Sequence, residues 1–400
     1  MPELGTKADG VVARFPISQL FAIRSVVVPQ FARHVNEAAL RPRKFVPLSL
    51  QAWRRSSAYD AAMASADPFS EPFGTLFGDM ITVARGGPDG YVYSGAAEPL
   101  ADFSLHPGTH ALHYGSTCFE GLKAHRQADG SVAIFRLDDH VQRFINSISL
   151  LRLPVPDADL LRQMMIDSAT ANLDHTPDQP GSLYLRPTII GADHNIGAAA
   201  APSTTSLLYI LCSPVGDYFA GGIRPLSLLV ETKTPRTTPQ FGSIKSGANY
   251  VMALGPTLEA KAAHGVDQVL FATDGDTTET GAANFFMITD DTLITRNLDD
   301  SFLHGITRSS IIQMASDLGY EVQERSVPVS EILDGAETTE MFLSGTAAVI
   351  APVGSLIHEG ETRTVRDGQP GPNTLRLREA LVAVQTGTAD DPHGWRTPLG

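Results

Sequence analysis

GSIKSGANY occupies residues 242–250 and is the most informative segment of this 400-residue chain. Its lysine, Lys245, stands between Gly242 and Gly247 among small residues, and Tyr250 follows five positions later. A lysine that serves solubility normally stands among polar residues on a helix face. Nearly charge-free surroundings instead disfavour the ammonium form and leave the amine free to act as a nucleophile.

An amine of this kind forms Schiff bases with carbonyl compounds, and pyridoxal phosphate is the commonest carbonyl cofactor that proteins hold in this way. That cofactor also needs an anion beside its pyridine nitrogen. Glu279 enters an otherwise small and apolar segment, TETGAANFF, which we interpret as a strand. A carboxylate there could keep the pyridine nitrogen protonated. The alternative interpretation is a glutamate exposed at a strand edge.

The cofactor's phosphate needs main-chain N–H groups or a cation, and three segments offer them. In HGITRSS a helix is predicted to begin after the glycine, so that the N–H groups of Ile306 and Thr307 would form an anion site. Thr346 in SGTAA offers a hydroxyl and an N–H beside a glycine. Arg136, which we place on the strand SVAIFRL, needs an anionic partner. A simple N-cap at Thr307 and a surface role for Arg136 are the alternatives.

Composition and charge exclude several classes of protein. A hydrophobic content of 42% can fill a large core, and 400 residues indicate two domains. The net charge of −14 argues against a nucleic-acid partner. Two cysteines predict neither a disulfide framework nor a metal site and fit a reducing compartment. With no apolar run near the roughly 18 residues of a membrane helix, we expect no membrane partner and a cytoplasmic location.

The pattern along the chain divides it into four parts. Residues 1–65 are predicted to be an extension, because the first sixty residues hold nine Lys or Arg against four acids. We interpret it as poorly ordered or docked on the surface, and an organelle transit peptide is the alternative. A small domain at 66–212, a linker at 213–222 and a large domain at 223–400 follow. Hairpins and irregularly mixed elements favour an α+β fold with antiparallel sheets.

Individual elements follow from periodicity and from turn residues. We expect helices over residues 138–151, from 157 to about 173, 248–264 and 307–318. We expect strands over residues 79–83, 91–93, 131–137, 182–190, 206–212 and 225–231, and in the segments VDQVLFA, TETGAANFFMI and TLITR.

Eight ordered motifs together resemble the branched-chain amino acid aminotransferases, which belong to class IV of the pyridoxal phosphate aminotransferases and to fold type IV. The motifs are HYGSTCFEGLKAHR (113–126), FR (135–136), LYLRP (183–187), SPVGDYF (213–219), IKSGANY (244–250), TETGAAN (278–284), LHGITR (303–308) and SGTAA (344–348). The tail VQTGTADDPHGW is also similar to that family's ending, so the resemblance covers about residues 70–400. It implies a smaller N-terminal α/β domain and a larger C-terminal domain with an antiparallel, barrel-like sheet.

The resemblance also implies roles for individual residues. Lys245 would be the Schiff-base lysine and the base that moves the α-proton, Tyr250 would bond the ring hydroxyl, and Glu279 would pair with the pyridine nitrogen. The phosphate would be held by Arg136, Ile306, Thr307 and Thr346. The substrate carboxylate would meet Tyr114 and the amides of Ala347 and Ala348. Phe119 and Tyr184 would line an apolar side-chain pocket, and Arg186 would receive the distal carboxylate of glutamate.

Three departures from the family pattern lie around the cofactor and the substrate mouth. His304 replaces the usual proline before GITR, TKTPRTTPQFGSI replaces a glycine-rich loop, and TETGAAN is unusual after its glutamate. Strict branched-chain specificity therefore stays open. Ala348 and Ala351 stand where some members carry a redox Cys-x-x-Cys, so we expect no thiol switch.

The leading hypothesis is a reversible transaminase that takes branched-chain L-amino acids and 2-oxoglutarate to branched 2-oxo acids and L-glutamate. Family members are usually homodimers or multiples of dimers, so Tyr114 could act in its own subunit's site or in its partner's. The alternatives are an aminodeoxychorismate lyase-like enzyme, a D-amino acid transaminase, a transaminase of a specialised amino acid, and a non-catalytic binding protein.

Overall fold

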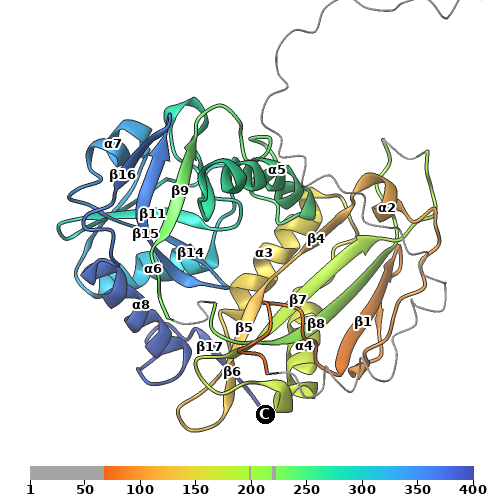
Figure 1. Ribbon diagram of the computed structural model, residues 1–400. Helices are drawn as coiled ribbons and strands as arrows, with labels where there is room; N and C mark the ends of the chain where they lie inside the picture. The colour runs from red at the N-terminus through yellow and green to blue at the C-terminus, as the bar shows by residue number, and fades with distance from the viewer. Residues whose placement is uncertain (1–66, 198–199, 219–221) are drawn as a thin grey trace, which may run out of the picture. The chain divides into compact units, whose positions relative to one another are not determined.

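The computed structural model describes residues 67–197, 200–218 and 222–400. The expected extension at residues 1–65 lies outside the described residues, as does part of the expected linker. The described chain forms two β-sheets with helices packed on them (Figure 1). The expected α+β class is thereby confirmed.

The first sheet has nine strands in the order β17-β6-β5-β7-β8-β1-β2, with β3 beside β1 and β4 beside β7. All of its pairings are antiparallel. Its strands are β1 (Met80–Gly87), β2 (Gly90–Tyr93), β3 (Glu98–Pro99), β4 (Thr117–Phe119), β5 (Leu122–Arg126), β6 (Val132–Phe135), β7 (Ser182–Gly191), β8 (Ser206–Val215) and β17 (Arg396–Leu399).

Two helices, α3 (Leu137–Leu150) and α4 (Ala158–Ala171), bury one face against this sheet. Val141, Phe144 and Ile148 of α3 recur at helical spacing and are all buried in one hydrophobic cluster. The same cluster contains Leu183 and Leu185 of β7. The spacing that predicted these helices is therefore the spacing of their buried side chains.

The second sheet has eight strands in the order β10-β9-β15-β14-β11-β12-β13, with β16 beside β15. It is mixed, because β9 pairs parallel with β10 and β15, and β12 pairs parallel with β13. Its strands are β9 (Leu226–Glu231), β10 (Gln268–Phe271), β11 (Asn284–Thr289), β12 (Thr292–Thr295), β13 (Glu321–Glu324), β14 (Glu340–Gly345), β15 (Val349–His358) and β16 (Glu361–Thr364).

The remaining helices lie mostly in the second half of the chain. They are α2 (His110–Tyr114), α5 (Gly247–His264), α6 (Ile306–Asp317), α7 (Val329–Asp334) and α8 (Pro372–Gln385), with short 3₁₀ turns η4 (Leu173–His175) and η5 (Thr273–Gly275). One cluster joins α6, α8 and the second sheet through Ile311, Leu377 and Phe342. Trp395 belongs to that cluster as well, one residue before β17.

The last strand returns to the first sheet. β17 pairs antiparallel with β6, from Arg396 opposite Phe135 to Leu399 opposite Val132. The division into domains at 66–212 and 223–400 stays a prediction, and the final residues of the second part contribute to the first sheet. This return places the C-terminal segment beside Arg136.

Several strand predictions are wrong at their ends, and two of these errors fall on predicted site residues. β6 ends at Phe135, and Arg136 is instead the residue before α3, with a φ of 56° in the left-handed region. β11 begins only at Asn284, so Glu279 lies ahead of the strand, in an isolated bridge with Asn284 across the bend at residues 281–282. At the expected linker, β8 continues to Val215.

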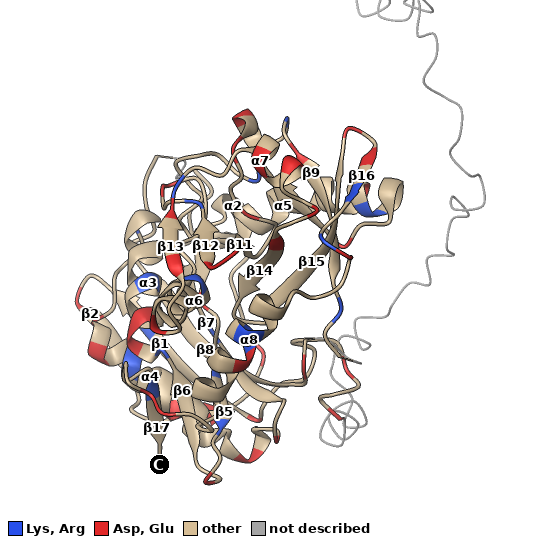
Figure 2. Ribbon diagram, turned by 90° about the vertical axis from the view of Figure 1, so that its left-hand side faces the viewer, with Lys and Arg blue, Asp and Glu red and all other residues tan. Residues whose placement is uncertain are grey.

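None of the described helices is long and apolar enough to cross a membrane. Within residues 67–400 as described, no group of three or more His, Cys, Asp or Glu side chains could hold a metal ion. Figure 2 shows acidic and basic segments interspersed along the described ribbon.

Candidate active site

Lys245 stands two residues before α5, a helix that contacts β4 of the first sheet and β10 of the second. Its Nζ donates a hydrogen bond of 2.9 Å to the hydroxyl of Tyr250, one turn into the helix. The same Nζ lies 5.1 Å from the ring centre of Phe119, at the end of β4. Main-chain bonds fix this junction, because the Phe119 N–H donates to the Lys245 carbonyl at 3.0 Å. The structure thus brings together three predicted site residues.

The loop before Lys245 is held by polar side chains that the sequence did not single out. Asn249 is fully buried, and its amide donates to the carbonyls of Phe241 and Ile244 at 2.9 and 2.7 Å. The Thr237 hydroxyl donates to the Asn249 oxygen at 2.7 Å. At Gly242 an added Cβ would lie 2.1 Å from the carbonyl carbon of Ser301. The unusual loop is therefore tightly packed, and only glycine fits at that position.

Glu279 is a buried carboxylate with one crowded oxygen. Oε1 lies 2.8 Å from an Arg236 nitrogen and accepts the N–H of Leu303 at 3.0 Å. Oε2 has only a long contact, 3.4 Å, with the amide of Asn284. Burial raises the pKa of Glu279 above its ordinary value, against the opposing charge of Arg236 and smaller contributions from Lys245 and Arg143. Glu279 is therefore a buried carboxylate that can face a cation, and it is not an exposed residue at a strand edge.

The expected anion site at residues 304–310 has the predicted form. α6 begins at Ile306 after Gly305, and no acidic residue stands in its first turn. Its first N–H groups are therefore unpaired donors at a positive helix end. At Gly305 an added Cβ would lie 2.0 Å from the Asn284 side-chain oxygen, so the helix start and the Glu279 turn are packed together.

Arg136 reaches α6 from the start of α3. Its Nη1 donates to the hydroxyls of Ser309 and Ser310 at 3.3 and 2.9 Å, and its Nε pairs with Asp139 at 2.6 Å. The guanidinium lies 5.0 Å from the Trp395 ring. A cavity of about 540 Å³ includes Arg136, Gly305, Ile306 and Ser309 in its lining. Arg136 and the helix N-terminus therefore open into one space.

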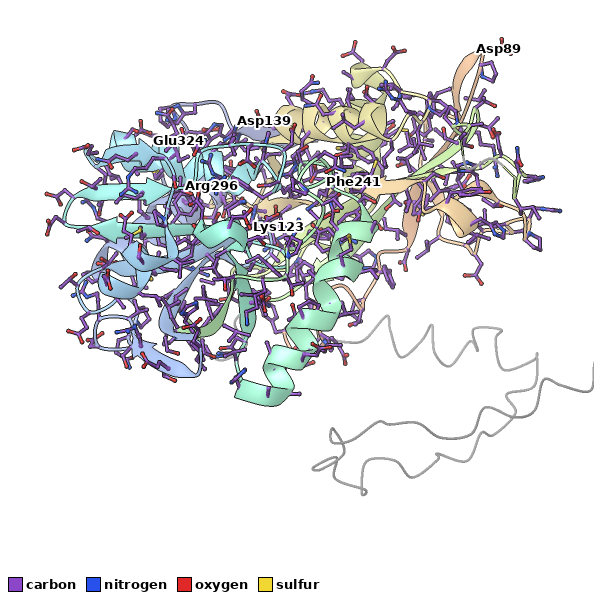
Figure 3. The ribbon with its side chains drawn as sticks, turned by 90° about the horizontal axis from the view of Figure 1, so that it is seen from above. Asp89, Lys123, Asp139, Phe241, Arg296 and Glu324 are labelled. Atoms are coloured by element: carbon purple, nitrogen blue, oxygen red, sulfur yellow. The ribbon has the colours of Figure 1, made fainter. Side chains whose placement is uncertain are left out.

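The turn after β14 carries Thr346, Ala347 and Ala348. Gly345 packs against the Ala282 carbonyl, since an added Cβ would lie 3.4 Å from it. Lys123, on β5 of the first sheet, is labelled in Figure 3. Its ammonium donates to the Ala347 carbonyl at 2.9 Å. Burial lowers the pKa of Lys123 to about 8, with Asp217 opposing and Arg378 adding to the shift. This buried lysine, absent from the sequence prediction, ties the turn to the first sheet.

Phe119, Tyr184 and Arg186 form one aromatic and cationic group. The Arg186 guanidinium lies 4.4 Å from the Phe119 ring centre and donates to the Tyr184 hydroxyl at 3.0 Å. An added Cβ at Gly121 would lie 2.0 Å from that hydroxyl, so the glycine makes room for the tyrosine. Arg186 thus joins the three residues expected to line the side-chain pocket, and Phe119 also lies beside Lys245.

Tyr114 stands apart from the other residues predicted to bind the substrate. It is 37% exposed at the end of α2, and its hydroxyl donates to the Ile196 carbonyl at 2.5 Å. Leu112 and Ile196 beside it are 61% and 71% exposed. Among the described contacts of the chain, Tyr114 is joined to neither Ala347 nor Ala348.

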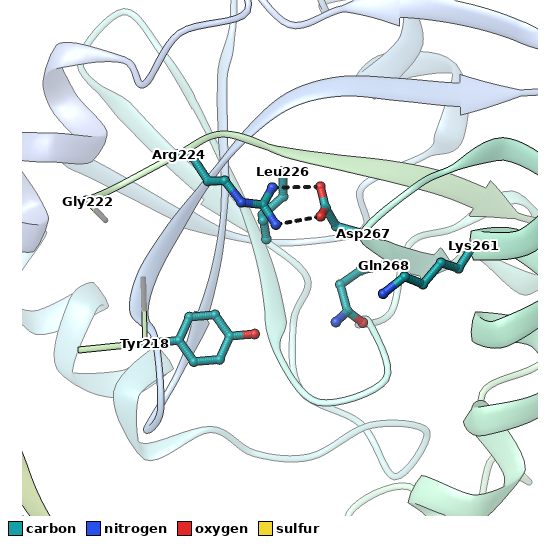
Figure 4. Close-up of a pocket in the computed structure, with 7 residues that line it drawn as sticks. All are labelled: Tyr218, Gly222, Arg224, Leu226, Lys261, Asp267 and Gln268. Carbon is teal, nitrogen blue, oxygen red and sulfur yellow. Dashed lines mark hydrogen bonds and ion pairs between the residues drawn. The ribbon is translucent and has the colours of Figure 1, made fainter. Parts of the chain in front are cut away.

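A separate hollow of about 370 Å³ lies beside β9 and β10 of the second sheet (Figure 4). Its most prominent charge, Arg224, is paired with both oxygens of Asp267 at 3.1 and 2.7 Å. None of the predicted site residues lines it. Arg224 is thereby neutralised, and Lys261 is the other cation in the lining.

Three comparisons give the known proteins to which this chain is similar. Residues 117–356 match the family model for amino-transferase class IV. A probable branched-chain-amino-acid aminotransferase of Streptomyces coelicolor is 38% identical over 341 residues, 82% of this chain and 92% of the relative. A chloroplastic branched-chain-amino-acid aminotransferase of Arabidopsis thaliana is 32% identical, over 82% of this chain and 79% of the relative. The branched-chain amino acid aminotransferase of Thermobaculum terrenum, solved in its PLP holo-form, matches with a TM-score of 0.66 and 26% identity, over 81% and 99% of the two chains.

Proposed function

This chain belongs to the branched-chain amino acid aminotransferases of class IV, and from that membership we propose how its own residues divide the work. The enzyme is a pyridoxal phosphate-dependent aminotransferase of fold type IV. It transfers the amino group of branched-chain L-amino acids to 2-oxoglutarate, giving branched 2-oxo acids and L-glutamate. The main support for these residue roles is that Lys245 contacts both Tyr250 and Phe119.

The fit of the site to the cofactor can be judged from polar groups that have few or no hydrogen-bond partners within the chain. The first N–H groups of α6 lack partners within the helix, and Oε2 of Glu279 has only one long contact. A phosphate and a protonated ring nitrogen would satisfy these two groups. The charge of Lys245 acts on Glu279, so the amine stands on the same side of the site as that carboxylate. When bound, the cofactor supplies an electron sink that stabilises negative charge at the substrate's α-carbon.

Each residue then has a definite task. Lys245 would hold the cofactor covalently and, when released by substrate, move a proton on its Nζ. Tyr250, which already accepts a hydrogen bond from that Nζ, orients the amine and would bond the ring hydroxyl. Glu279 would keep the ring nitrogen protonated. The phosphate would be held by Arg136, Ile306, Thr307 and Thr346.

The substrate groups would bind on either side of Phe119. The amides of Ala347 and Ala348 would take the α-carboxylate, and Lys123 supports that turn because its ammonium donates to the Ala347 carbonyl. A cation on a carbonyl strengthens the N–H of the same peptide unit as a donor. Phe119, Tyr184 and Arg186 would form the pocket that takes either an aliphatic side chain or the distal carboxylate of glutamate.

A homodimer is supported by the exposed apolar surface around Tyr114. Leu112 and Ile196 lie there, and α5 exposes Val251, Leu254 and Leu258 by 70%, 53% and 56%. Exposed side chains of this size on one helix are typical of an interface. In such a dimer, Tyr114 would complete the partner's substrate site. This would explain why Tyr114 lacks contact with Ala347 and Ala348 in its own chain.

The location of the enzyme is proposed to be cytoplasmic. The basic first sixty residues keep an organelle address as the alternative, and the chloroplastic relative supports that alternative. A fractionation experiment with antibodies against residues 67–400 would separate the two, because import would remove the basic segment and shorten the chain.

Incubation of the purified protein with L-leucine and 2-oxoglutarate tests the function. We expect L-glutamate to form, and a panel of amino donors to rank leucine, isoleucine and valine first. Pyruvate release from a chorismate derivative would indicate the lyase alternative, and turnover of D-alanine the D-amino acid alternative. Lys245→Ala should abolish turnover, and activity retained in that variant would reject the lysine assignment.

A further inference from the structure

Arg236 touches three parts of the site from the loop between β9 and α5. It is 3% exposed, and its Nη1 lies 2.8 Å from Oε1 of Glu279. Its Nε and Nη2 both donate to the Gly281 carbonyl at 3.2 Å, within the turn that follows Glu279. The guanidinium carbon also lies 5.6 Å from the ring centre of Tyr250.

We propose that Arg236 is a positioning residue for the cofactor: it fixes Oε1 of Glu279 and leaves Oε2 free to face a protonated ring nitrogen. The inference rests on the proposed function, since it assigns how that carboxylate is oriented and kept charged. It concerns a residue of the segment TKTPRTTPQFGSI, which departs from the usual family loop.

The two oxygens of Glu279 differ because of Arg236. Oε1 receives the guanidinium and the Leu303 N–H, whereas Oε2 meets only Asn284 at 3.4 Å. The carboxylate has about four acceptor positions, so the unused ones lie mainly on Oε2. The two bonds from Arg236 to Gly281 hold the turn at the same time, so the guanidinium and the carboxylate cannot shift independently.

The contact between Arg236 and Glu279 is one of charge rather than of a well-aligned hydrogen bond. The nitrogen and the oxygen are close, yet the N–H of Nη1 does not point at a partner. A lysine at the same position would therefore supply the charge but not the two contacts with Gly281. This difference allows the electrostatic and the orienting roles to be separated.

Positively charged residues on several neighbouring segments act on the Glu279 carboxylate. Arg236 lies on the preceding loop, Lys245 before α5 and Arg143 on α3, and the Leu303 N–H adds a hydrogen bond. Burial raises the pKa of Glu279, and Arg236 is the strongest of the groups that oppose burial. Without Arg236, the carboxyl would take up a proton at a higher pH. A neutral carboxyl cannot keep the ring nitrogen cationic.

Arg236→Met, Arg236→Lys and Glu279→Gln test the inference in the pyridoxal phosphate-loaded enzyme. The readouts are the dissociation constant of the cofactor, its visible absorbance as a function of pH, and kcat. For Arg236→Met we expect kcat to fall about 100-fold, a typical loss when one electrostatic stabiliser is removed. Its absorbance should change with pH in a range where the wild-type absorbance is constant. Arg236→Lys should restore the wild-type pH dependence but bind the cofactor more weakly.

Two further variants keep the result interpretable. Arg236→Met leaves a buried carboxylate unpaired and could prevent folding, so a double variant with Glu279→Gln removes both charges together. We expect the double variant to fold and to have the kcat of Glu279→Gln alone, because the two residues act as one unit. Arg325→Met, which breaks a half-exposed ion pair with Glu331, is the matched control and should keep the wild-type kcat.

The outcomes separate the inference from the function on which it rests. If Arg236→Met shows the wild-type kcat and pH profile, the inference is overturned. If the double variant has a much lower kcat than Glu279→Gln, Arg236 acts elsewhere and the inference is also overturned. If Lys245→Ala keeps covalently bound cofactor, the proposed function fails whatever the arginine variants show.

Discussion

Lys123→Met is expected to stabilise the folded enzyme at neutral pH while it weakens substrate binding. Lys123 is 8% exposed, and burial lowers the pKa of its ammonium from 10.5 to about 8. The charge is nevertheless used, because Nζ donates to the Ala347 carbonyl. A methionine keeps most of the side-chain volume without the charge.

The size of the effect follows from the pKa. A shift from 10.5 to about 8 corresponds to a cost of about 3 kcal/mol for carrying the proton in the folded state at neutral pH. Loss of the hydrogen bond to Ala347 offsets about 1–2 kcal/mol of that gain. We therefore expect the Met variant to be more stable than the wild type by about 1–2 kcal/mol at neutral pH.

The dependence on pH has a definite sign. Between about pH 8 and 10.5 the unfolded wild type binds more protons at this lysine than the folded one, so the wild-type free energy of unfolding rises with pH in that window. The Met variant lacks this contribution. Its advantage should therefore be constant below about pH 8 and disappear as the pH approaches 10.5.

Urea unfolding of both proteins at a series of pH values measures the difference, and Lys261→Met on the exposed side of α5 is the control. The same preparations should show a raised KM for leucine in Lys123→Met. A stability difference that stays the same from neutral pH to pH 10.5 would refute the reasoning. So would a Met variant with an unchanged KM.

Three other perturbations give further tests. Trp395→Leu removes the ring beside Arg136, so the dissociation constant of pyridoxal phosphate should rise about tenfold in a fluorescence titration. An unchanged dissociation constant would show that the ring has no part in phosphate binding. Leu254→Asp places a charge on the exposed apolar side of α5 and should shift a dimer to monomers in sedimentation velocity; an unchanged mass would place the interface elsewhere. Tyr250→Phe removes the hydroxyl that orients Lys245 and should lower kcat about tenfold or more in a glutamate assay. A smaller decrease would argue against an orienting role for that hydroxyl.

The elements that bury one face were predictable from the sequence. Val141, Phe144 and Ile148 have helical spacing and form the buried face of α3, and the apolar segments at 182–190 and 206–212 are the strongly paired strands β7 and β8. The helix start at Ile306 was also predictable, because a glycine before it leaves the first N–H groups open. In each case a local pattern and the packing agree.

The positions of Arg136 and Glu279 could not be predicted from the local sequence pattern. Each adjoins apolar residues that continue a strand pattern, yet Arg136 stands just before α3 and Glu279 ahead of β11, and each side chain has a distant partner. For Arg136 the partners are Ser309 and Ser310, and for Glu279 the partner is Arg236. Such contacts between distant segments leave no periodic signal in the chain.

Buried polar residues were missed for the same reason. Arg236 stands among threonines and prolines and resembles a residue of an exposed loop, although it is 3% exposed. Lys123 lies within the motif that carries the resemblance, but only the fold shows that its ammonium reaches the turn at Ala347. A buried charge is recognised by its partner, and the partner of Lys123 lies 224 positions further along the chain.

The central claim is that Lys245 carries the cofactor. Borohydride reduction of the pyridoxal phosphate-loaded enzyme, followed by digestion and peptide mass spectrometry, tests this claim directly. The account predicts one pyridoxyl group, on the peptide that contains Lys245, and none in Lys245→Ala. A pyridoxyl group on a different lysine, or no modified peptide at all, would contradict it.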